Sequence, residues 1–167
     1  MKRIIQVVLC LLALPAAGSH IVGGEFEVLH LADYRYQINL IIYFDEVNGI
    51  PANKQQDATI NAIIYRKSDN SFIRYVNLPF ASEDSVHYTI PECAIGEIQT
   101  SRMLYTTEVT LSPQIYDDPE GYYIVWERCC RNYSITNIFS EESIPPTINP
   151  NSAGQTFYLE FSPVVKD

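Results

Sequence analysis

The sequence predicts an all-β protein: an antiparallel β-sandwich, immunoglobulin-like in broad outline, with about seven to nine strands. Three observations predict this class. Apolar and polar residues alternate in several short stretches. Tyrosine and phenylalanine, which favour strands, are frequent, with 12 and 7 residues. Turn-forming tracts separate the alternating stretches, and no stretch keeps the 3.6-residue apolar period of a helix for long.

The clearest strand is predicted over residues 34–44, where every second residue from Tyr34 to Phe44 is apolar. The same alternation predicts strands over residues 58–64, 105–111 and 157–161. Residues 122–128 also form an apolar, aromatic stretch, which ends at two adjacent cysteines. Turns or loops rich in Pro, Asn, Asp, Ser and Gly are predicted between the strands, at residues 48–51, 68–71, 117–121 and 143–154.

The first 18 residues predict a signal peptide. Lys2 and Arg3 form a basic start, a mostly apolar run follows from Ile4 to Leu14, and small residues then supply a cleavage site before Ser19. The run is too short to span a bilayer, which takes about 20 apolar residues. A retained signal anchor is the alternative. We therefore expect residues 19–167 to form one secreted or cell-surface domain without membrane insertion after cleavage.

Three cysteines remain after cleavage, Cys93, Cys129 and Cys130, and an odd number leaves at least one thiol without an intramolecular partner. Neighbouring side chains of a strand point to opposite faces, so Cys129 and Cys130 need different partners. We expect one bridge from Cys93 to Cys129 or Cys130, and favour Cys130 because it shares the face of Ile124 and Trp126. A vicinal bridge and three reduced thiols are the alternatives.

The charge and the motifs predict a protein without catalysis. Without Lys2 and Arg3 the chain keeps nine basic residues against 20 acidic ones, a net charge of −11 that disfavours nucleic acid as a partner. The segment Ile21–Gly24 matches the activated start of trypsin-like proteases, but the Ser–His–Asp triad and its flanking motifs are missing. We find no candidate catalytic residue, no cofactor motif and no Cys/His spacing suited to zinc.

Three segments occur together in an informative order: residues 19–25 (SHIVGGE), residues 36–40 (YQINL) and the segment from Gly121-Tyr122-Tyr123 to Arg128–Asn132 (RCCRN). Together they resemble the N-terminal domain of large secreted Bacteroidota surface proteins, of the gliding-motility-associated type with PKD repeats and a C-terminal sorting domain. The resemblance extends from the signal peptide to about Phe161. It implies that the protein is exported, is secreted or located at the cell surface, has no enzyme activity and forms the N-terminal module of a longer protein.

The chain departs from this family at two cysteine positions. Members usually carry one cysteine after the first strand and one at the end of the second. Here the corresponding segments read Val28-Leu29-His30 and Phe44-Asp45-Glu46. The pairing of the family therefore cannot be carried over to the cysteines of this chain.

Two functions of different class stay open. The first is a surface module that binds a glycan or a protein in adhesion or envelope assembly; the second is a structural cap or spacer without a ligand. An exposed cluster among the tyrosines at positions 34, 43, 65, 75 and 123 would favour the first, and scattered tyrosines the second. We expect Trp126 to pack in the core and Arg128 to cap the core edge or pair with a carboxylate.

Overall fold

The computed structural model describes residues 21–47, 49, 51, 54, 57–87, 99–128 and 155–163. They contain seven strands: β1 (Ile21–Ala32), β2 (Arg35–Asp45), β3 (Thr59–Arg66), β4 (Phe72–Ser85), β5 (Thr100–Thr110), β6 (Tyr122–Arg128) and β7 (Gln155–Phe161). The predicted signal peptide, Cys93, Cys129 and Cys130 lie outside the described residues, so export and the disulfide stay predictions. Within the described ranges, no helix has the length and hydropathy needed to span a bilayer.

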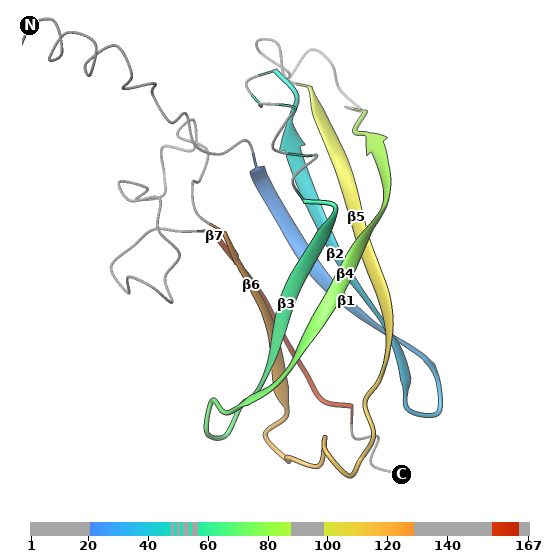
Figure 1. Cartoon of the computed structure of the whole chain (residues 1–167), viewed down its shortest axis with the longest axis vertical. Helices are drawn as coiled ribbons and strands as arrows, with labels where there is room; N and C mark the ends of the chain where they lie inside the picture. The colour runs from blue at the N-terminus through green and yellow to red at the C-terminus, as the bar shows by residue number, and fades with distance from the viewer. Residues whose placement is uncertain are drawn as a thin grey trace, which may run out of the picture.

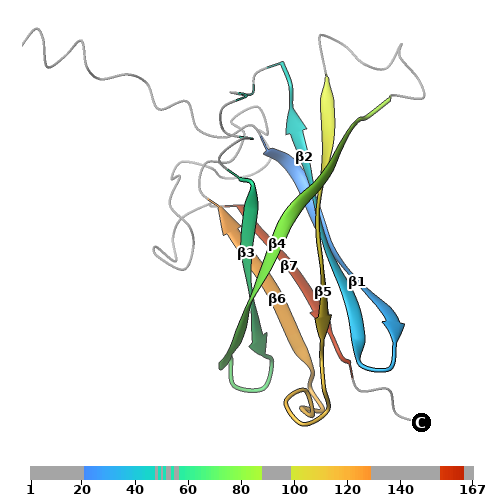
Figure 2. The ribbon, with the colours of Figure 1, turned by 45° about the vertical axis from the view of Figure 1, so that its right-hand side comes forward.

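The seven strands form one antiparallel sheet in the order β1-β2-β5-β4-β3-β6-β7. The two end strands, β1 and β7, lie next to each other, so the sheet is nearly closed and resembles a barrel (Figures 1 and 2). The all-β, antiparallel prediction is confirmed. The finer prediction of an immunoglobulin-like sandwich is not confirmed, because the pairing describes one continuous sheet.

The alternating sequence pattern builds the interior of this sheet. On β2 the predicted apolar positions Tyr36, Ile38, Leu40, Ile42 and Phe44 are all buried. The even positions of β3 are buried as well, as are apolar residues of the remaining strands, and together they form one continuous core (Ile60, Ala62, Ile64, Val76, Leu78, Met103, Tyr105, Val109, Tyr122, Ile124 and Phe157, among others). Trp126 packs against this core, as predicted.

Strand β4 joins the two halves of the sheet. Its first part, up to Pro79, pairs with β3, and its second part, from Phe80 to Ser85, pairs with β5. Proline has no N–H to give to a strand ladder, and an irregularity between Phe80 and Ser82 turns the strand further. As a result β4 crosses the molecule from the side of β3 to the side of β5 (Figures 1 and 2).

The seam between β1 and β7 is closed by side chains. The ring of Phe157 on β7 lies over Gly24 of β1, where an added Cβ would come within 2.6 Å of the ring and 2.4 Å of the Ile41 carbonyl oxygen. Trp126 stacks on the same Phe157 ring, with 5.3 Å between the centroids. The buried Tyr36 hydroxyl donates a hydrogen bond to the Pro163 carbonyl oxygen, 3.0 Å away, and so fixes the end of β7 to β2.

Candidate functional site

Part of the outer face of β3, β4, β6 and β7 is apolar where a solvated sheet would be polar. Ile60, Ala62 and Ile64 of β3 point into the core, so Ile63 and Tyr65 point outward. The strand register places Tyr75 and Val125 beside Ile63, and Phe72 and Tyr123 beside Tyr65. Tyr158 of β7 pairs with Val125. We call this set of seven residues the aromatic face (Ile63, Tyr65, Phe72, Tyr75, Tyr123, Val125 and Tyr158).

The five rings of the aromatic face form a continuous row across four strands. The centroids of successive rings are 5.0 Å apart from Tyr75 to Phe72, 6.4 Å from Phe72 to Tyr65, 5.3 Å from Tyr65 to Tyr123 and 5.2 Å from Tyr123 to Tyr158. The central pair, Tyr65 and Tyr123, is stacked with an interplanar angle of 22°. Cross-strand aromatic pairs of this kind stabilise a sheet, and here they also hold each ring in place.

The ends of the row are exposed to solvent. Phe72, Tyr75 and Tyr158 keep 52%, 61% and 50% of their surface accessible, while the central residues are half-buried by their neighbours. Single exposed apolar residues are common on proteins, but a contiguous group of them marks an interaction surface. The aromatic face therefore has the character of a binding surface.

Polar groups border the row and fix its hydroxyls. Tyr158 donates a hydrogen bond of 2.8 Å to Glu160, whose carboxylate also pairs with the Lys67 ammonium. Tyr123 donates to the side-chain oxygen of Asn70 at 3.1 Å. Partial burial, together with the hydrogen bond to Glu160 and its charge, raises the pKa of Tyr158 to about 12. Near neutral pH the Tyr158 hydroxyl is therefore uncharged, and the Glu160 carboxylate beside it is paired with Lys67.

This arrangement is suited to binding a partner. Stacked rings bury large apolar areas on contact, and their hydroxyls accept or donate hydrogen bonds at the edge of a partner. The described residues include no group of three or more His, Cys, Asp and Glu side chains that could hold a metal ion.

The structure brings together three of the five tyrosines singled out in the sequence. Tyr65, Tyr75 and Tyr123 belong to the aromatic face, whereas Tyr34 lies in the turn between β1 and β2, and Tyr43 lies on β2 with its hydroxyl 3.5 Å from Glu25. Arg128 pairs with Asp57, as predicted.

Sequence reasoning missed Ile63, Phe72, Val125 and Tyr158. A usable signal was present on β3, where the outward positions change from the polar Thr59 and Asn61 to the apolar Ile63 and Tyr65.

Comparisons of the chain with protein-family models, with curated proteins and with solved structures gave no match. The functional argument therefore rests on the geometry of the aromatic face and on the sequence.

Proposed function

We propose that the protein is a non-catalytic, extracellular or cell-surface module of a Bacteroidota exported protein, and that it binds a partner through the aromatic face in adhesion or envelope assembly. The observation that carries this proposal is the continuous row of five rings, exposed at both ends. A contiguous row of exposed rings is more typical of an interaction surface than of a structural spacer.

The ring geometry favours a protein over a glycan as the partner. Because Tyr65 and Tyr123 stack on each other, much of their ring faces is covered, and they offer edges and hydroxyls instead. Tyrosine presented in this way is enriched among the residues that dominate protein–protein affinity. The bordering hydroxyls of Tyr123 and Tyr158 are already oriented by Asn70 and Glu160, which lowers the entropy lost on binding.

The sandwich-like character of the fold is part of the same proposal. The two halves of the sheet share β4 and pack their inner faces on one core. An immunoglobulin-like relationship would agree with a module that presents one outer sheet face to a partner.

We expect the double substitution Tyr75→Ser/Tyr158→Ser to weaken partner binding by at least about 30-fold, because both rings are exposed and a tyrosine that acts as a hot spot of an interface contributes about 2 kcal/mol or more. The domain of residues 19–167 would be immobilised, and binding of envelope proteins and of a glycan array measured in parallel. Because both side chains lie on the surface and lose only cross-strand contacts, the free energy of unfolding measured in urea should fall by no more than about 1–2 kcal/mol.

Tyr34→Ser is the matched control, because Tyr34 is 49% exposed but lies away from the face. Equal binding by the wild type and the double variant would refute the aromatic face as the site. A glycan that is bound by the wild type and lost by the double variant would replace the protein partner. A domain that retains neither class of ligand would favour the structural spacer.

A further inference from the structure

A pocket opens at the end of the barrel-like sheet where β3 begins and β4 has already turned away to β5. The last contact between the two strands is the hydrogen bond from the Phe80 N–H to the Ala58 carbonyl oxygen, 3.0 Å long. Beyond it, β4 pairs with β5, and Glu83 lies opposite Met103. The change of partner leaves a space between β3 and β4 that backbone pairing does not fill.

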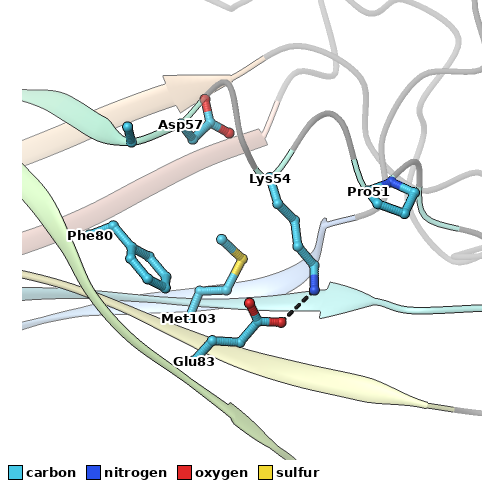
Figure 3. Close-up of a pocket in the computed structure, with 7 residues that line it drawn as sticks. Pro51, Lys54, Asp57, Phe80, Glu83 and Met103 are labelled. Atoms are coloured by element: carbon cyan, nitrogen blue, oxygen red, sulfur yellow. Dashed lines mark hydrogen bonds and ion pairs between the residues drawn. The ribbon is translucent and has the colours of Figure 1, made fainter.

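The pocket has a volume of about 540 Å³. Figure 3 shows Pro51, Lys54 and Asp57 on one side, and Phe80, Met103 and Glu83 on the other. Pockets that bind small molecules commonly have volumes of about 300–1,000 Å³ and mostly apolar walls with a few polar groups. This pocket meets both conditions, with Phe80 and Met103 as its largest apolar side chains.

The charges in and around the pocket are already paired with each other. The Lys54 ammonium binds the carboxylates of Glu46 and Glu83, and it lies 4.7 Å from the centroid of the Phe44 ring. Asp57 is paired with Arg128. Burial alone would lower the pKa of Lys54, but the hydrogen bonds to the two glutamates raise it overall. An ionic ligand would have to break these pairs, so the pocket is suited to a neutral molecule.

Behind the residues that line the pocket lies a buried polar group without a partner among the described residues. Tyr105 follows Met103 by two residues on β5, so both side chains point to the same face of the strand. Its ring packs edge-to-face on Phe80, with 5.7 Å between the centroids. Tyr105 has no accessible surface, and its hydroxyl makes no hydrogen bond with any described residue.

Two residues that line the pocket lie close to Tyr105: Phe80 contacts its ring, and Asp57 is near enough for its charge to act on the hydroxyl. Burial raises the pKa of this hydroxyl, the negative charge of Asp57 raises it further, and Arg128 acts in the opposite direction. A neutral hydroxyl can donate to an oxygen and also accept from a donor. A buried hydroxyl without a partner destabilises the protein, and a ligand that supplies the missing hydrogen bond removes this cost.

We propose that this pocket binds a small, neutral, mainly apolar molecule that carries a hydroxyl or carbonyl oxygen, and that this oxygen forms a hydrogen bond with Tyr105 once the flexible Met103 side chain moves aside. The site is separate from the aromatic face and does not depend on it. Phe80 and Met103 contact the apolar part of the ligand, and the ion pair of Lys54 with Glu83 borders the entrance.

Nile red, a neutral apolar dye with one carbonyl oxygen, is a suitable probe for the mature chain of residues 19–167. We expect saturable binding with a rise in fluorescence. Tyr105→Phe removes only the hydroxyl and should weaken binding about five- to tenfold, with emission shifted to the blue because the hydrogen bond to the dye is lost. Met103→Trp fills the pocket and should abolish binding.

Two further variants keep the test decisive. Ala58→Leu narrows the pocket from an exposed rim position, so it should weaken binding even if Met103→Trp fails to fold. The aromatic-face variant Tyr75→Ser/Tyr158→Ser should bind the dye like the wild type. Absence of dye binding, equal affinity of wild type and Tyr105→Phe, or loss of binding in the aromatic-face variant alone would each overturn the proposal.

Discussion

Replacing Gly24 with alanine should lower the free energy of unfolding by about 3 kcal/mol, because the new Cβ has no space where β1 meets β7. It would lie 2.4 Å from the Ile41 carbonyl oxygen and 2.6 Å from the Phe157 ring. The backbone of β2 cannot move away without disturbing its pairing with β5. The ring of Phe157 is also held in place, because the ring of Trp126 stacks on it with 5.3 Å between the centroids.

The adjacent glycine provides the control for this substitution. A Cβ at Gly23 would meet no atom within 4 Å, so Gly23→Ala should change stability by less than about 1 kcal/mol. Urea unfolding of both variants gives the two free energies directly. If Gly24→Ala and Gly23→Ala unfold at the same urea concentration, the close approach of β7 to β1 is not part of the folded protein in solution.

The parts of the fold that sequence could predict are those where one strand face is buried and the other is polar. β2 is the clearest case, because its even positions face the core along the whole strand. β3 and β5 follow the same rule over their inner positions. In these strands the alternation of apolar and polar residues is enough to predict both the strand and the face that is buried.

β4 could not be predicted in the same way, although it is the longest strand. Pro79 argues against a strand interior, and the pairing is irregular both opposite Tyr65 and between Phe80 and Ser82. These irregularities shift the alternation of side chains, so no single period describes residues 72–85. The barrel-like closure depends on the change of β4 from pairing with β3 to pairing with β5. It could therefore not be predicted from the sequence either.

The aromatic face depends on strand register, which a single sequence does not reveal. Tyr65 and Tyr123 are neighbours only because β3 pairs with β6, and Tyr158 joins them only through the pairing of β6 with β7. The pocket likewise combines parts that lie far apart in the sequence, since Met103 belongs to β5 and Asp57 comes just before β3. The composition shows that the chain has many tyrosines, but the order of the strands in the sheet determines which of them lie side by side.

Tyr122 holds the loop between β5 and β6 against the core. Its side chain has no accessible surface, and its ring lies 4.9 Å from Tyr116 and 6.2 Å from Phe161, measured between centroids. Its hydroxyl donates to the Ile115 carbonyl oxygen at 2.9 Å and accepts from the Asp118 N–H at 3.1 Å. One side chain thus combines core packing with two hydrogen bonds to a loop.

Two substitutions at this position should separate these contributions. Tyr122→Ala should lower the free energy of unfolding by about 4 kcal/mol, because it leaves a cavity the size of an aromatic ring. Tyr122→Phe keeps the ring but leaves the Ile115 carbonyl and the Asp118 N–H without their partner, at a cost of about 1–3 kcal/mol. Urea unfolding measures both values.

Limited proteolysis distinguishes a freed loop from a weakened core. In Tyr122→Phe the loop of residues 111–121 should be cut faster than in the wild type, while the core strands stay protected, because only the loop has lost hydrogen bonds. In Tyr122→Ala protection should fall throughout the chain. If the phenylalanine variant is cut no faster than the wild type, the hydroxyl of Tyr122 does not hold the loop, and core packing alone accounts for the buried tyrosine.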